Sequence, residues 1–280
     1  MFEEKKRLPV GVENFEQMIK ENYYYVDKTR LIGELLRNGG MVNLFTRPRR
    51  FGKTLNMSML EHFFSIEGEE NLFEGLEIAK DTKLCEAYRG KYPVIFLSLK
   101  GINAGSYDTA FRLTMETVKG AAKKAKFLEM SEKLDNHEKE DYRALLDKEM
   151  DEATLFLSLK TLSELLEKHY GEKVIVLIDE YDVPLAKAFE NGYYDQMVFL
   201  IRNLLEQVLK TNNSLKFAVM TGCMRISKES IFTGLNNFTT FTITDVDFDK
   251  YFGFTDREVR ELLKYYACTD KYESIKEWYD

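Results

Sequence analysis

The most informative stretch of the chain reads Arg47-Pro48-Arg49-Arg50-Phe51-Gly52-Lys53-Thr54. The usual phosphate-loop pattern is G-x-x-x-x-G-K-[S/T], and this stretch matches it everywhere except at the first glycine, which is Arg47 here. A short apolar run at residues 41–45 precedes the stretch, and apolar residues at helical spacing follow it over residues 57–64. The sequence therefore predicts a phosphate-binding loop between a strand and a helix. The alternative for the tripeptide alone is a chance Gly-Lys-Thr on a surface turn.

Each residue type at the end of this loop has a chemical use. Loop N–H groups and the N-terminus of the next helix point at phosphate oxygens, and Gly52 lets the backbone approach them closely. Lys53 supplies a positive charge to the β- and γ-phosphates, and Thr54 offers a hydroxyl to Mg²⁺. We therefore expect ATP and Mg²⁺ to be bound here, by Arg47, Pro48, Arg49, Arg50, Phe51, Gly52, Lys53, Thr54 and Leu55.

Arginines are concentrated at the start of the loop, at positions 47, 49 and 50. Between them, Pro48 restrains the backbone in place of the missing glycine. The arginines are open to three interpretations: a solvated patch, a contact to nucleic acid, or added positive charge for the nucleotide. All three stay open at the level of the sequence.

A pair of carboxylates ends a second apolar run, Val176-Leu177-Ile178-Asp179-Glu180. A buried strand that ends in Asp-Glu is the expected second half of an ATPase site, because ligands bind at the carboxyl edge of an open parallel sheet. We expect Asp179 to hold Mg²⁺ through water, and Glu180 to orient and deprotonate the attacking water. The alternative is an ordinary strand that ends in a polar turn. Asp182 is expected to have a structural role before Pro184.

A third candidate lies at the end of the apolar run of residues 215–220, where Thr221 and then Arg225 follow. In an ATPase of this kind, the strand between the two phosphate motifs carries a polar sensor. Thr221 would report on the γ-phosphate or the attacking water, and Arg225 would stabilise charge in the transition state. The alternatives are a cap for Thr221 and a surface ion pair for Arg225.

The rest of the chain alternates short apolar runs with amphipathic helices. Runs at residues 41–45, 94–99, 174–178, 215–220 and 238–243 predict strands, the first four of them covered on both faces. This alternation indicates an α/β domain with a mostly parallel sheet. Residues 119–152 are rich in Lys, Glu and Asp, and we expect them to form an insertion of exposed, solvated helices.

Composition limits the class of protein. The chain has 280 residues, enough for one large or two small domains, and its net charge of −7 argues against a general binder of polyanions. Its three cysteines are far apart, which argues against a disulfide framework and favours a reducing compartment. Without a signal peptide, and with no apolar run near the roughly 20 residues of a membrane helix, we expect a cytoplasmic protein with no membrane partner.

The pattern changes after about residue 244. Thr255 and Glu258 have the spacing of a capping box, and apolar residues follow at helical spacing. The chain then stops in an amphipathic aromatic segment, residues 275–280, which would normally pack on something. We therefore expect a fragment whose second, helical domain is incomplete.

These motifs together resemble the bacterial AAA-ATPase-like family, a group of P-loop ATPases related to the STAND and AAA+ classes. The unusual Arg-Pro-Arg-Arg-Phe-Gly-Lys-Thr loop is the form that this family has. Matching stretches occur along nearly the whole chain, at residues 8–11, 25–29, 46–54, 93–100, 177–182, 221–222, 225–228, 231–232, 234–237 and 252–255.

The resemblance implies a P-loop NTPase domain over residues 1–244, with a five-stranded sheet in the order 5-1-4-3-2 flanked by helices. It also implies the start of a helical or winged-helix-like lid over residues 245–280. Family members usually continue into a PD-(D/E)XK nuclease-like domain, which would lie outside this chain. By analogy with related ATPases, residues 25–28 would line the adenine pocket; a packing role for the tyrosines is the alternative.

Three functions follow from these observations. The first is a Mg-dependent ATPase that acts as a nucleotide switch for an effector domain outside the fragment. Such a protein could bind further copies of itself as a homo-oligomer. The second is an ATP-regulated module for nucleic-acid processing, linked to a C-terminal nuclease-like domain. The third is a scaffold that does not hydrolyse ATP, and the presence of Lys53, Thr54, Asp179 and Glu180 together argues against it.

Overall fold

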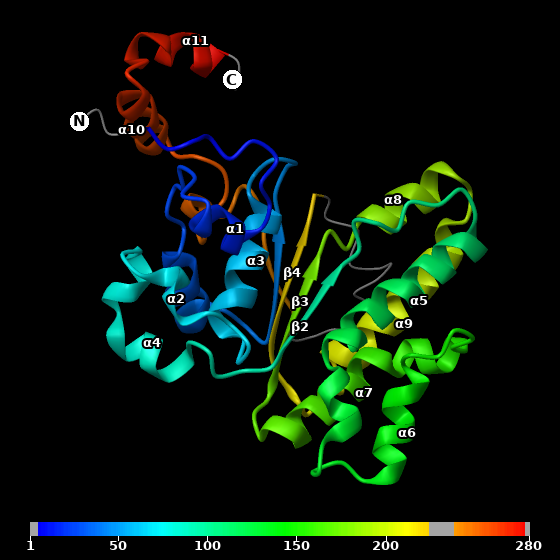
Figure 1. Cartoon of the computed structure of the whole chain (residues 1–280). Helices are drawn as coiled ribbons and strands as arrows, with labels where there is room; N and C mark the ends of the chain where they lie inside the picture. Colours follow the sequence, from blue (N-terminus) through cyan, green and yellow to red (C-terminus); the bar gives the residue numbers. More distant parts are fainter. Residues whose placement is uncertain (1–4, 224–237, 278–280) are drawn as a thin grey trace.

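A five-stranded, fully parallel sheet forms the centre of the computed structural model, which describes residues 5–223 and 238–277 (Figure 1). The strands are β1 (Val42–Thr46), β2 (Val94–Ser98), β3 (Val174–Asp179), β4 (Leu215–Gly222) and β5 (Phe238–Phe241). Their order is β2-β3-β4-β1-β5. This is the predicted order 5-1-4-3-2 read from the opposite edge, so the prediction of an α/β P-loop type sheet is confirmed.

The central strands are covered on both faces, which explains why their sequences are continuous apolar runs and do not alternate between apolar and polar residues. All six residues of β3 are buried. Val174, Val176 and Ile178 pack into one core, and Ile175 and Leu177 pack into the other. Alternate side chains of this strand therefore belong to two separate hydrophobic cores, one on each face of the sheet.

Helices cover both faces (Figure 1). One face carries α1 (Phe15–Lys20), α2 (Arg30–Asn38), α3 (Lys53–Phe64) and α4 (Thr82–Tyr88). The other carries α5 (Tyr107–Lys124), α6 (Asn136–Ala144), α7 (Glu152–Tyr170), α8 (Val183–Glu190) and α9 (Tyr194–Leu209). Short 3-10 helices lie at Glu70–Phe73, Glu77–Lys80, Lys126–Met130, Asp249–Tyr251 and Thr269–Lys271. None of the helices in residues 5–223 and 238–277 has the length and apolar character needed to cross a membrane.

The charged segment of residues 119–152 needs a correction. It is helical, but it is not a set of exposed helices, because Leu128, Tyr142 and Leu145 are at most 1% exposed and belong to a hydrophobic core. The Tyr142 hydroxyl also donates to the carbonyl of Ala122 at 2.8 Å. Most of the Lys and Glu residues face solvent and outnumber the residues of a sparse apolar stripe, so a count of charges underestimates the burial.

The last part of the chain forms α10 (Asp256–Tyr266) and α11 (Tyr272–Glu277). The predicted capping box is present: the Thr255 N–H donates to Glu258 Oε2 at 2.7 Å, and the Glu258 N–H donates to Thr255 Oγ1 at 3.3 Å. The N-terminal segment lies beside α10 (Figure 1), where the Tyr266 hydroxyl donates to the Lys6 carbonyl at 2.6 Å. Segments from opposite ends of the chain therefore stabilise each other, while the division into domains at residues 244 and 245 remains a prediction.

Candidate functional site

Three neighbouring strands bring the predicted motifs to one edge of the sheet. The loop of residues 47–52 follows β1, Asp179 ends β3, and Thr221 lies near the end of β4. Because β4 pairs with both β1 and β3 in parallel, the carboxyl ends of all three strands meet. Ligands of open parallel sheets bind at this edge.

The loop has the backbone conformation for which its glycine is required. Gly52 is the residue before α3 and has a φ of 72°, in the left-handed region that glycine adopts at little cost. Arg50 also has a positive φ of 68°, which is uncommon for a residue with a side chain. Such strained backbone is found at functional loops, and here it precedes the N-terminus of a twelve-residue helix.

The Lys53 side chain folds back over the loop and is 5% exposed. Its ammonium donates to the carbonyls of Arg47 at 2.9 Å and Pro48 at 2.8 Å, and contacts Cys223 Sγ at 3.3 Å. The positive charge is therefore held at the centre of the loop. Sequence reasoning missed Cys223, although its place directly after β4 is a signal that it lies at this edge.

A buried carboxylate connects the phosphate-loop side of the site to the end of β4. Asp179 is fully buried, its Oδ2 accepts from the Thr54 hydroxyl at 2.8 Å, and its Oδ1 accepts from the Thr221 hydroxyl. The Thr221 hydroxyl therefore binds the acidic motif and does not cap a helix. A hydroxyl and a carboxylate are oxygen donors of the kind that Mg²⁺ prefers. Among residues 5–223 and 238–277, no group of three or more His, Cys, Asp or Glu side chains has an arrangement that could hold a metal ion.

Glu180 lies at a sharp turn of the chain, with a φ of 54°. Its N–H donates to the Thr221 hydroxyl at 3.4 Å. Burial raises the pKa of the Glu180 carboxyl, the charge of Asp179 raises it further, and the charges of Lys100 and Lys53 oppose this shift. Lys100, which follows β2 and whose ammonium binds Glu13 at 2.7 Å, is a charged neighbour that the motif analysis did not single out.

Asp182 and Gly222 hold the turn after β3 against the end of β4. The Cys223 N–H donates to Asp182 Oδ2 at 2.9 Å, which fits the structural role expected for this carboxylate. At Gly222 there is no room for a side chain, because a Cβ there would lie 2.5 Å from Tyr181 Cε1 and 2.8 Å from Asp182 Oδ1.

A Gly222→Ala substitution is therefore expected to destabilise the fold by about 1–3 kcal/mol, the typical cost of overpacking a well-packed site. Chemical unfolding measures the effect. Gly105→Ala is the matched control, because no atom lies within 4 Å of its Cβ position. Equal stability of the two variants would contradict the tight packing at Gly222.

The loop arginines differ in their surroundings. Arg49 and Arg50 are exposed, whereas Arg47 is 2% exposed. The Arg47 guanidinium donates to the carbonyls of Thr46 at 2.9 Å and Phe241 at 2.8 Å. A solvated patch is therefore excluded for Arg47, because its side chain is buried at the edge of the sheet. Arg225 lies outside the described residues, and its role remains a prediction.

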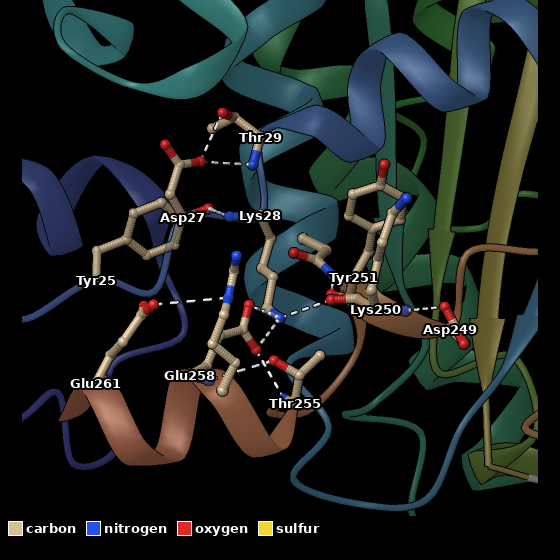
Figure 2. Close-up of polar contacts among 12 residues, drawn as sticks. Tyr25, Asp27, Lys28, Thr29, Asp249, Lys250, Tyr251, Thr255, Glu258 and Glu261 are labelled. Carbon is tan, nitrogen blue, oxygen red and sulfur yellow. Dashed lines mark hydrogen bonds and ion pairs between the residues drawn. The ribbon is translucent and has the colours of Figure 1, made fainter. Parts of the chain in front are cut away.

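Residues 25–29 form a network with the start of α10 (Figure 2). Figure 2 shows the Lys28 side chain extending to Glu258, and the ammonium binds both carboxylate oxygens at 2.7 Å and the Lys250 carbonyl at 2.6 Å. Tyr25 packs against Phe15 with ring centroids 5.5 Å apart, and burial raises the pKa of its hydroxyl. These contacts are those of a packing residue. The pairing of Lys28 with Glu258 was not foreseen from the sequence.

Comparisons with known proteins agree with this geometry. A family model described as a predicted AAA-ATPase, AAA-ATPase-like, matches residues 9–232. A curated relative, the "Uncharacterized protein in vnfD 5'region" of Azotobacter chroococcum mcd 1, is 27% identical over 291 residues. The alignment covers 99% of this chain and 48% of that relative, so the chain spans about half the length of the relative. No solved structure matches the chain significantly.

Proposed function

Because the chain belongs to the AAA-ATPase-like family of predicted AAA-ATPases, we propose that it binds Mg-ATP on residues 47–55 and hydrolyses it. The observation that carries the proposal is the convergence of Lys53, Thr54, Asp179 and Thr221 at one edge of the sheet. The family match establishes only that the chain is a member of a family of predicted AAA-ATPases. The reaction and the roles of individual residues are our proposal.

In this proposal the loop receives the triphosphate. Loop N–H groups and the N-terminus of α3 face the phosphates, and Lys53 moves its ammonium from the Arg47 and Pro48 carbonyls to the β- and γ-phosphate oxygens. The Thr54 hydroxyl and the Asp179 carboxylate, 2.8 Å apart, would hold Mg²⁺, directly and through water respectively. When bound, Mg²⁺ neutralises charge on the phosphates and orients them.

Glu180 is the proposed general base, and Thr221 positions it. The Thr221 hydroxyl contacts both the Asp179 carboxylate and the Glu180 N–H, so it holds the two acidic residues in fixed relation. A carboxyl whose pKa burial has raised is better suited to accept a proton from water than an ordinary glutamate. Arg225 is the proposed group that stabilises charge in the transition state.

We propose that hydrolysis serves as a switch for an effector outside this chain. The match to 48% of a longer relative supports this arrangement, because the other half of that relative has no counterpart in these residues. In this view residues 1–244 bind the nucleotide, and residues 245–280 begin a helical lid that passes the signal on. Contacts of α10 with the N-terminal segment and with Lys28 support a defined lid position.

Calorimetric titration of Mg-ATP tests the proposal. Lys53→Ala is expected to weaken binding about 10- to 100-fold, because a hydrogen bond to a charged group contributes about 1.5–3 kcal/mol. Lys210→Ala is the control, since it removes an exposed lysine that pairs with Glu206 on α9. EDTA is expected to weaken binding to the parent protein. A folded Lys53→Ala protein that binds as tightly as the parent would contradict the proposed site.

A further inference from the structure

Arg47 stands where the phosphate-loop pattern has a glycine, and its main chain belongs to the loop. The Arg47 N–H donates to the Gly222 carbonyl at 3.0 Å, which extends the pairing of β1 with β4 by one residue. Its own carbonyl accepts from the Lys53 ammonium at 2.9 Å. The backbone of Arg47 therefore connects the sheet to the lysine of the proposed nucleotide site.

The Arg47 side chain points away from the loop, toward the end of β5 and toward residues 249–253, the segment that leads into α10. Its guanidinium carbon lies 4.9 Å from the centroid of the Phe252 ring, and Nη1 donates to the Phe241 carbonyl at 2.8 Å. Phe252 is itself only 6% exposed. Burial lowers the pKa of this guanidinium, while the charges of Asp245 and Asp249 oppose that shift. A buried cation of this kind is costly unless its contacts are well formed.

A second contact joins the loop to the same segment. The Gly253 N–H donates to the Phe51 carbonyl at 3.0 Å. Gly253 has a φ of 70°, and a Cβ there would lie 3.0 Å from Phe51 Cδ1. Loop and segment are thus in direct contact at two adjacent positions, and we call the residues Arg47, Phe51, Phe252 and Gly253 the loop joint.

The segment is also fixed on its other sides. The Asn56 side chain, one turn into α3, donates to the Tyr251 carbonyl at 2.9 Å. Lys28 binds the Lys250 carbonyl and Glu258, which are drawn with it in Figure 2. The loop joint therefore rests on a segment that two other parts of the chain, Asn56 of α3 and Lys28, hold in place, and α10 follows this segment after Thr255.

We propose that Arg47 is a positioning residue for a nucleoside triphosphate: through Phe252 and the Phe241 carbonyl its guanidinium fixes the loop backbone that places Lys53. This inference rests on the proposed function and adds its link to α10. If the loop joint sets the geometry of the loop, α10 docking and nucleotide binding are coupled, and each strengthens the other by the same factor. A glycine at position 47 would leave the loop and the segment that leads into α10 without the guanidinium contact.

The test combines Arg47→Met, Phe252→Leu and the double variant in a cycle, with the Kd for Mg-ATP measured by calorimetry well below the unfolding temperature. Each single variant is expected to raise Kd about tenfold, since each removes the ring contact of a buried guanidinium. The double variant is expected to raise Kd no more than the single variant with the larger effect, because both substitutions remove the same contact. Lys216→Met is the control, since it removes a cation over the ring of Tyr92, with 5.3 Å from Nζ to the ring centroid, away from the loop.

Hydrogen exchange supplies a readout that a purely structural role would not change. In the parent, Mg-ATP is expected to slow amide exchange in both α3 and α10; in Arg47→Met only the effect on α3 should persist. If Arg47→Met does not fold, Phe252→Leu and Gly253→Ala carry the same test, because both alter the joint without removing the arginine. Folded joint variants with the parental Kd and unchanged protection of α10 would overturn the inference. A parent that binds no nucleotide would overturn the proposed function and this inference with it.

Discussion

A Glu180→Gln protein is expected to bind Mg-ATP as tightly as the parent and to hydrolyse it about 100- to 10,000-fold more slowly, the usual contribution of a positioned general base. The amide has nearly the shape of the carboxylate but cannot accept a proton from water. The Glu180 N–H would still donate to Thr221, so the turn itself is retained. Binding should persist because the groups expected to hold the phosphates are those of the loop and Thr54.

Phosphate release under single-turnover conditions measures this effect apart from product release. Glu190→Gln is the matched control, because it changes an exposed glutamate that pairs with Lys187 at the end of α8. Hydrolysis by Glu180→Gln at the parental rate would show that another group activates the water. Loss of nucleotide binding in Glu180→Gln would instead show that Glu180 contributes to the binding site.

The second large effect is expected at the Lys28–Glu258 ion pair, whose side chains are 8% and 13% exposed. Lys28→Met would leave the Glu258 carboxylate buried without its cation, and breaking a buried pair from one side costs about 3–5 kcal/mol. The Thr255 N–H would still donate to Glu258, but this hydrogen bond does not neutralise the buried carboxylate and therefore does not replace the lost cation. The free energy of unfolding, measured with a chemical denaturant, should fall by that amount.

A double variant separates the charge from the packing. Lys28→Met with Glu258→Gln removes both charges and keeps an oxygen for the Thr255 N–H, so most of the lost stability should return. Lys210→Met, at an exposed pair on α9, should have a much smaller effect. If Lys28→Met were no more destabilising than Lys210→Met, the pair would not hold α10 in place.

Much of the fold could be predicted from local patterns. The strand runs, the helix after the loop and the capping box at Thr255 were all found where they were expected. Each depends on residues within a few positions of one another, which is the range over which periodicity and capping act. The segment of residues 119–152 was judged wrongly because a charged composition does not show which residues of a helix face the core.

Local sequence patterns were enough to predict a phosphate site at the sheet edge. Gly52 stands directly before Lys53, and the apolar run of β3 ends in Asp179 with Glu180 directly after it, so these residue types already indicate a phosphate site. Two contacts could be found only in the folded molecule: Arg47 points into the fold, and Lys28 pairs with Glu258, 230 residues further along the chain. Those contacts depend on how distant segments approach each other, and a charge read from the sequence carries no information about the partner that folding brings to it.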